Sequence, residues 1–143
     1  MKDIRLAIRS LLTGDPAIAA IITVGGISRV YPGTLPQGTT LPSVVQNLIT
    51  ESSDYHLIGP SYLGQSRMQI DCWAQLPDDA VLLADLVLDK LSGYSGVTAV
   101  GSSSPQDTID VEAIFHDQGR DDFDATAKMY TRRRDSLIWF RQS

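Results

Sequence analysis

The feature that most constrains the fold is a strict alternation of apolar and polar side chains in the second half of the chain. From Arg67 to Ala74 every second residue, beginning with Met68, is apolar or small. Because successive side chains of a strand point to opposite faces, this pattern predicts a strand with one buried face. A second such strand is expected over 107–116, and a long final strand over 127–140 with a bulge near its arginines. The second strand is expected to bury Ile109, Val111, Ala113 and Phe115.

Helical spacing replaces this alternation in two places. Residues 3–12 carry apolar side chains three and four positions apart until Gly14, and Asp15-Pro16 then start a short second helix over 17–23. Residues 77–91 open with a proline and two acids, which favour a helix start. The expected core stripes are Ile4, Ala7, Ile8, Leu11 and Leu12 in the first helix, and Ala80, Leu83, Ala84, Val87 and Leu91 in the last.

The order of these elements decides the fold class. Further short strands are expected over 27–31, 43–50 and 97–100. Because only one helix separates strands in the second half, a parallel doubly wound sheet does not fit. The sequence therefore predicts an α+β fold, a mostly antiparallel sheet with two to three helices packed on one face. A length of 143 residues suits one domain spanning 1–143.

Two connections between the predicted strands carry apolar side chains that a small core does not need. Residues 32–42 contain three prolines and two glycines, which exclude regular structure there. Residues 51–64 are expected to form a long loop, and we expect the segment 51–66 to be mobile in the free subunit and ordered after assembly. Apolar side chains in such loops indicate a partner surface. The expected contact residues are Leu35, Leu41, Tyr55, Leu57, Ile58, Tyr62 and Leu63.

The charge distribution leaves two interpretations open. The net charge of −5 disfavours a general nucleic-acid binder. Residues 77–125 carry 11 acidic and 2 basic side chains, including an expected acidic turn over 118–124, whereas residues 126–143 carry 5 basic and 1 acidic side chain. Such unlike segments can attract each other between neighbouring copies, or they can neutralise each other within one fold.

The triplet Arg132-Arg133-Arg134 is the one basic cluster of the sequence. It is compatible with an exposed edge strand kept soluble by charge, with a contact to another subunit or partner, or with a phosphate contact. We take the three arginines as candidate interface residues. A DNA-binding adaptor that uses them is a further hypothesis, which salt-dependent DNA binding would support.

Catalytic and metal-binding patterns receive no positive support. His56 and His116 lie sixty residues apart without a second ligand nearby, and Cys72 falls on the apolar face of a predicted strand. The acids from Asp117 to Asp124 lack the glycine and glutamate positions of a calcium loop. No phosphate-binding or nucleophile motif occurs. We expect no catalytic residue, metal or cofactor, and a small hydrolase is only the second hypothesis.

The remaining composition indicates where the chain is made. No apolar run reaches the ~18–20 residues of a membrane helix, so we expect no membrane association. The first five residues, Met1 to Arg5, do not resemble a secretory signal. Cys72 is the single cysteine, which excludes an internal disulfide and fits synthesis in a reducing cytoplasm.

Several ordered stretches carry a family resemblance. They are Arg29 to Gly33, Leu35 to Gly38, Leu41 to Val45, Arg67 to Ala74 followed by an alanine- and leucine-rich helix, and the final strand from Tyr130 to Phe140. In this order and spacing, over nearly the whole chain, they resemble the tail-completion proteins of long-tailed bacteriophages, also called tail terminators. The stretch from Gly101 to Ser104 and the dense acidic turn depart from the common pattern.

The resemblance implies a non-catalytic virion protein. Its members form a six-membered ring that caps the tail tube, ends tail elongation and joins the tail to the head connector. The implied partners are further copies of the chain, the tail tube protein and head–tail connector proteins, while DNA passes through the lumen without specific binding. The implied place is the head–tail interface of the virion, after assembly in the bacterial cytoplasm. A head-side connector or a minor tail protein of the same fold is the alternative.

Overall fold

The computed structural model describes residues 3–99 and 108–141. Expectations for Val100, Gly101 to Ser104 and Asp107 lie outside these residues. Three helices and eight strands are described: α1 (Ile4–Gly14), α2 (Pro16–Ile22), β1 (Thr23–Val24), β2 (Ile27–Ser28), β3 (Val30–Pro32), β4 (Ser43–His56), β5 (Gly59–Ala74), α3 (Pro77–Leu91), β6 (Gly96–Ala99), β7 (Thr108–Asp124) and β8 (Met129–Arg141).

Six of the strands form one sheet in the order β3-β4-β5-β8-β7-β6. Every neighbouring pair is antiparallel except β3 and β4, which run parallel. Strands β1 and β2 form a separate small hairpin. This arrangement confirms the predicted α+β class with a mostly antiparallel sheet.

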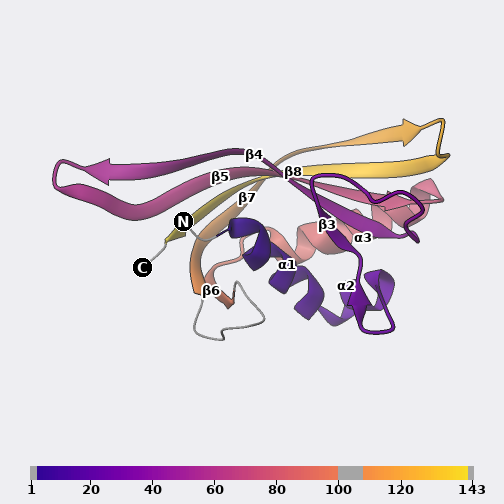
Figure 1. Cartoon of the computed structure of the whole chain (residues 1–143), viewed down its shortest axis with the longest axis horizontal. Coiled ribbons are helices and arrows are strands. Elements are labelled where there is room, and N and C mark those ends of the chain that lie inside the picture. The colour runs from indigo at the N-terminus through magenta and orange to yellow at the C-terminus, as the bar shows by residue number, and fades with distance from the viewer. Residues whose placement is uncertain (1–2, 100–107, 142–143) are drawn as a thin grey trace.

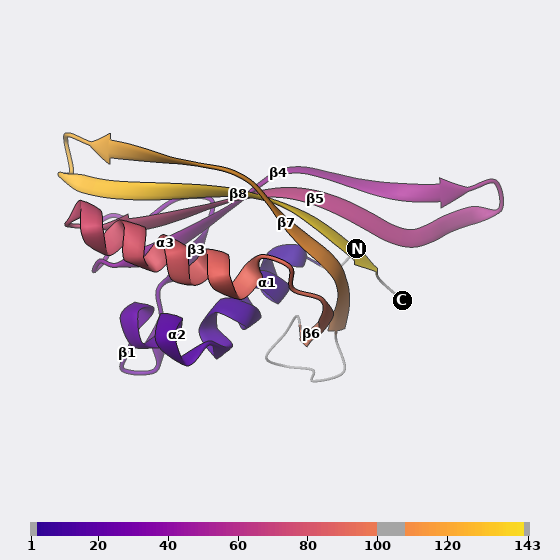
Figure 2. The ribbon, with the colours of Figure 1, turned by 180° about the vertical axis from the view of Figure 1, so that it is seen from behind.

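The three helices lie together on one side of the sheet, and its other face is open (Figures 1 and 2). The predicted stripes of α1 and α3 are buried, as the spacing required. Asp15 caps α2 by accepting hydrogen bonds from the backbone N–H groups of Ala17 and Ile18. None of the described helices is long and apolar enough to cross a membrane.

The core lies between the helices and the inner face of β5 and β8. Met68, Ile70 and Cys72 on β5 are completely buried, as are Ile138 and Phe140 on β8. Full burial of one aliphatic or aromatic side chain contributes about 1.5–3 kcal/mol. The alternation predicted for Arg67 to Ala74 is therefore confirmed, because it reflects one face packed against helices.

The expected loop over 51–64 is wrong, because this segment is the outer half of a long hairpin. Strand β4 continues to His56 and β5 starts at Gly59, with only Leu57 and Ile58 between them. The pairing runs from Ser43 opposite Trp73 to His56 opposite Gly59, with two register shifts. A backbone ladder holds this segment, and such a ladder needs no apolar periodicity in the sequence.

The expectations for β7 need two corrections. Two register shifts against β8 insert Glu112 and Asp117 as extra residues. The first shift reverses the alternation, so Ile114 is buried while Phe115 is exposed, and Ala113 does not share the buried face of Ile109 and Val111. In addition, the predicted acidic turn over 118–124 is strand, and the turn follows at 125–128. Both bulges thus lie on β7 and not on β8, and the second stands opposite Ser136 and Asp135, next to Arg134.

Two further differences concern the ends of the sheet. The predicted strand over 27–31 is divided at Arg29 between β2 and β3. Strand β8, predicted in one alternative to be an edge strand, lies between β5 and β7 in the interior of the sheet. Edge protection therefore does not explain its arginines.

The two long hairpins extend in opposite directions (Figure 1). The β4–β5 turn lies at one end of the molecule. The β7–β8 turn lies at the other end, near the connection 33–42 and the start of α3 (Figures 1 and 2). The two ends of the molecule therefore carry different structures, the β4–β5 turn at one end and the β7–β8 turn at the other.

Candidate assembly surfaces

The residues considered for catalysis or metal binding do not come together. His56 lies at the exposed end of β4, His116 is half-buried on β7, and Cys72 is buried in the core. Within 3–99 and 108–141, no group of three or more His, Cys, Asp or Glu side chains is placed to hold a metal ion. The acids from Asp117 to Asp124 are spread along a strand.

Cys72 has the surroundings of a structural thiol. It is completely buried, and burial raises its pKa well above that of a free thiol, with a smaller contribution from neighbouring Asp71. We therefore expect the native protein to resist alkylation by iodoacetamide at pH 8, whereas the protein in 8 M urea is labelled at once. Mass spectrometry of the two samples checks this. Rapid labelling of the native protein would contradict the packing around β5.

The arginine triplet is engaged within the chain. Arg132 Nη1 lies 2.8 Å from Asp121 Oδ1, and Arg133 Nη1 lies 3.6 Å from Asp122 Oδ2. On β7, Asp121 stands directly opposite Arg132 of β8, and Asp122 stands opposite Thr131. The Arg132–Asp121 pair therefore lies straight across the two strands, and the Arg133–Asp122 pair lies diagonally across them. The role of Arg132 and Arg133 in subunit contacts remains a prediction.

Arg134 lies on the buried face of β8 and contacts α3. Its side chain is 9% exposed, and its Nη2 donates to Asp85 Oδ1 at 2.6 Å. Gly119 on β7 makes room for it, because a Cβ there would lie 2.9 Å from Arg134 Nη1. The burial of this side chain indicates a role in packing β8 against α3.

The unlike charges of the two C-terminal segments neutralise each other to a large extent inside the fold. Besides the triplet, Arg141 Nε lies 3.2 Å from Glu112 Oε1, again between β8 and β7. This matches the second interpretation of the charge distribution. Attraction between copies is therefore not needed to explain it.

A polar cluster occupies the open face of the sheet. Asp71 on β5 is 4% exposed; it accepts a hydrogen bond from Gln69 Nε2 and lies 3.4 Å from Arg133 Nε. A cavity of about 200 Å³ adjoins the cluster. Desolvation by burial raises the pKa of Asp71 above its usual value, against the opposing effects of Gln69 and Arg133.

This raised pKa gives a pH-dependent stability prediction. The raised pKa means that the folded protein disfavours the ionised form of Asp71. The free energy of unfolding therefore falls as pH rises from the pKa of the unfolded chain through the higher pKa of the folded protein, and it stays lower above that pH. Asp71→Asn removes the charge and should stabilise the protein relative to wild type at pH 7 but not at pH 3. Urea unfolding at both pH values measures this. A difference that is equal at the two pH values would contradict the prediction.

The free end of the β4–β5 hairpin is the most exposed apolar feature of the described chain. Among the described residues, pairing of β5 with β8 ends at Leu63 opposite Arg141, and residues 54–62, which we call the arm, form a two-stranded projection beyond it. Leu57 and Ile58 at its turn are fully exposed, and Tyr55 and Tyr62 expose 70% and 60% of their surface. A two-stranded hairpin is marginally stable alone in water, and exposed apolar side chains are typical of contact surfaces, so the role of the arm in subunit or partner contacts stays a prediction.

The base of the arm is anchored in the core. Phe140 on β8 stands opposite Gly64, where a Cβ would lie 2.7 Å from the Phe140 ring. Just beyond, Tyr62 adopts a positive φ of 64°, which is uncommon for an aromatic residue. The Ser61 hydroxyl donates to the Asp54 carbonyl and accepts from the Leu63 N–H. These contacts give the arm a defined path out of the sheet.

A hollow lies at the opposite end of the molecule, between the connection 33–42 and the β7–β8 turn. It has a volume of about 610 Å³, and we call it the distal hollow. Leu35 and Leu41 line it together with Trp73 and Met129. The buried Arg29 holds the connection in place by donating from Nε to the Pro42 carbonyl and from Nη2 to the Ile21 carbonyl.

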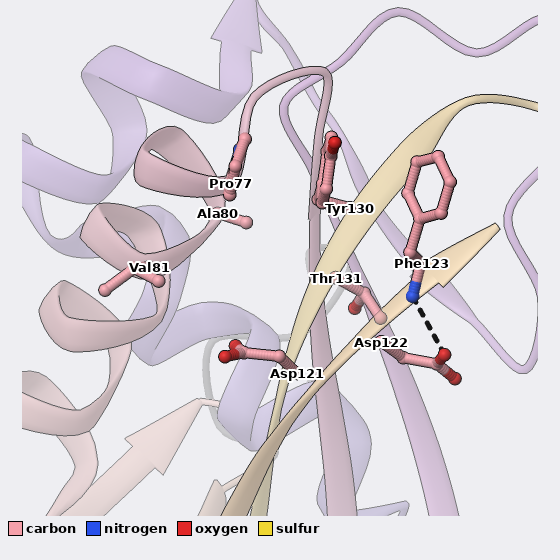
Figure 3. Close-up of a pocket in the computed structure, with 8 residues that line it drawn as sticks. All are labelled: Pro77, Ala80, Val81, Asp121, Asp122, Phe123, Tyr130 and Thr131. Carbon is pink, nitrogen blue, oxygen red and sulfur yellow. Dashed lines mark hydrogen bonds between the residues drawn. The ribbon is translucent and has the colours of Figure 1, made fainter. Parts of the chain in front are cut away.

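A second hollow lies where the start of α3 meets β7 and β8 (Figure 3). Its volume is about 380 Å³, and we call it the helix-side hollow. Pro77, Ala80 and Val81 form the helical wall, and the Phe123 and Tyr130 rings, 4.6 Å apart, form part of the other. Its charged lining residues are Asp121 and Asp122, which pair with Arg132 and Arg133.

The structure divides the predicted contact residues into two groups. Tyr55, Leu57, Ile58 and Tyr62 belong to the arm with half-buried Leu63 at its base, whereas half-buried Leu35 and Leu41 line the distal hollow. The sequence reasoning did not select Trp73 and Met129 as surface residues. The partial exposure of Trp73 could have been predicted, because the alternation in β5 places it on the face opposite the buried residues.

Comparison with known proteins supports an assembly role. The family model described as "Tail completion protein gp17" matches residues 6–140. A chain of a solved structure, titled "Virion of native gene transfer agent (GTA) particle", is similar over 97% of this chain and 95% of that chain, with 16% identity and a TM-score of 0.62. At that identity the likeness shows the fold alone. No curated protein matches the chain. Because the family model covers nearly all of the sequence, the chain belongs to the tail completion protein gp17 family, structural virion proteins of phage tails and not a class of enzymes.

Proposed function

We propose that the protein assembles as a ring of identical copies, six by analogy with its family, on the end of the phage tail tube. The ring ends tail elongation and presents a surface to the head connector. The observation that carries this proposal is the arm, because a projecting hairpin with four exposed apolar side chains is unsuited to a subunit that acts alone.

Two different surfaces at opposite ends of one chain are the arrangement that ring formation requires. A contact between unlike surfaces repeats from copy to copy, and it closes into a ring when the rotation between copies allows. The arm and the hollows at the β7–β8 end supply such unlike surfaces. The gene transfer agent chain of the same fold comes from a structure titled as a virion, which fits this proposal.

DNA is expected to pass the ring without specific binding. The arginines of β8 are already paired with acids of β7: Arg132 with Asp121, Arg133 with Asp122 and Arg141 with Glu112. Cations held by carboxylates are poorly available to phosphates, so a lumen bordered by these two strands would not retain DNA. Proteins that bind DNA through basic side chains behave differently, because their affinity depends steeply on salt.

The proposal is tested by adding the purified protein to tail tube protein of the same phage while it polymerises. We expect elongation to stop at tubes whose ends carry the added protein, with a tube length that falls as the protein concentration rises. Bovine serum albumin at equal concentration is the control. Unchanged tube length with no protein at the tube ends would contradict the proposal, and binding to head connectors alone would favour a head-side role.

A further inference from the structure

We propose that the arm of one copy occupies the distal hollow of the next copy, which would be the contact that closes the ring. This inference rests on the proposed ring and names its interface. The starting observation is geometric: the arm and the distal hollow lie at opposite ends of the chain, so each copy can give one contact and receive one (Figure 1).

The chemistry of the two surfaces matches. The arm presents Leu57 and Ile58 at its turn, fully exposed, and the distal hollow has a mixed lining in which Leu35, Leu41 and Trp73 offer apolar surface beside polar side chains. A volume of about 610 Å³ is within the range of ordinary binding pockets. The turn of a hairpin can therefore enter it, and both surfaces lose exposed apolar area.

Charge complementarity selects this hollow and this occupant. Asp54 on the arm and Lys128 on the rim of the distal hollow have opposite charges, and neither forms an ion pair within 3–99 and 108–141. Asp124 on the same rim is already engaged, because its Oδ1 accepts from the backbone N–H groups of Thr126 and Ala127. The charged residues that line the helix-side hollow are Asp121 and Asp122, which already pair with Arg132 and Arg133, so this hollow offers Asp54 no free cation among the described residues.

The first test removes the apolar turn. Leu57→Ser with Ile58→Ser should raise the concentration needed for half-maximal ring formation at least about tenfold, because the contact loses two buried aliphatic side chains. Val24→Ser with Ile27→Ser is the matched control, since these residues sit on the small β1–β2 hairpin and are similarly exposed, at 65% and 71%. Sedimentation velocity measures assembly. Equal effects of the two double variants would overturn the proposal.

The second test exchanges the charges. Asp54→Lys and Lys128→Asp should each weaken assembly about two- to fivefold, the size expected of an exposed ion pair, and the variant carrying both changes should recover. A double variant that assembles no better than either single variant would count against this pairing of arm and rim.

The third test maps the contact directly. A variant with Ile58→Cys is mixed with one carrying Gln37→Cys, a residue of the distal hollow, and treated with a short bismaleimide; the native Cys72 is buried and does not compete. We expect a covalent dimer of the two variants, and none when Asp89→Cys, exposed on α3, replaces Gln37→Cys. Rings without this product would overturn the contact but leave the proposed function standing. Absence of rings and capped tubes from the wild-type protein would overturn both.

Discussion

Replacing Phe140 with alanine is expected to lower the free energy of unfolding by about 3–5 kcal/mol. The side chain is completely buried on β8, and its ring lies over Gly64 of β5 at the base of the arm. The change removes a large apolar group and leaves a cavity that the surrounding strands cannot fill. Chemical denaturation measures the loss. Phe123→Ala is the control, because Phe123 is 46% exposed and its ring partner among the described residues is Tyr130, so about 1 kcal/mol is expected there.

A double-mutant cycle with Gly64 separates packing at this point from general destabilisation. Gly64→Ala alone should cost about 1–3 kcal/mol, because its new Cβ would lie 2.7 Å from Phe140 Cζ. In the Phe140→Ala background the same change meets no ring, and its cost should fall close to zero. Additive effects of the two changes would contradict the described approach of ring and backbone.

Removal of Asp85 should destabilise the fold more than removal of the arginine that it contacts. The pair is asymmetric, since the Arg134 side chain is 9% exposed and the Asp85 side chain is 56% exposed. Asp85→Ala leaves a buried guanidinium without its carboxylate, and we expect a loss of about 3 kcal/mol. Arg134→Met instead removes the buried charge and keeps an apolar chain of similar length, so about 1 kcal/mol is expected.

The same pair also locates the helices on the sheet. Asp85 lies on α3 and Arg134 on β8, so the contact spans the boundary between the two layers. Urea unfolding of both single variants and of the combined variant gives the coupling energy. A larger loss for Arg134→Met than for Asp85→Ala would show that the arginine acts through charge attraction rather than through burial.

The parts of the fold that were predictable are those that bury one face against a neighbour. The stripes of α1 and α3 and the alternation in β5 have the period that burial imposes, and all three are confirmed. The outer half of the β4–β5 hairpin has no such period, because the arm is exposed and is held mainly by backbone pairing between its two strands. Its serines, glycine and proline therefore indicated a loop.

The alternation in β7 misled for a different reason. A bulge adds one residue and exchanges the two faces of the strand, as Glu112 does between Val111 and Ala113. Nothing in the sequence marks that position, so Phe115 was expected in the core although it is exposed. The later bulge at Asp117 and the continuation of β7 through its acids follow from the register against β8, which is long-range information.

The candidate surfaces were predictable as a set but not as a geometry. Surplus apolar residues outside the predicted elements identified the arm and the lining of the distal hollow together. The arm residues lie at one end of the molecule and the hollow residues at the other because of the strand order, and this order could not be predicted from the sequence. The arginine triplet is the opposite case, because it is conspicuous in the sequence but its side chains form ion pairs within the chain, with Asp121, Asp122 and Asp85.

We propose that this chain forms a ring-shaped cap on the tail tube. Negative-stain electron microscopy of the purified protein, alone and mixed with tail tubes of its phage, tests it most directly. We expect closed rings, or a ring-shaped cap on one end only of each tube. Tubes with bare ends beside a protein that stays monomeric at every concentration would contradict it.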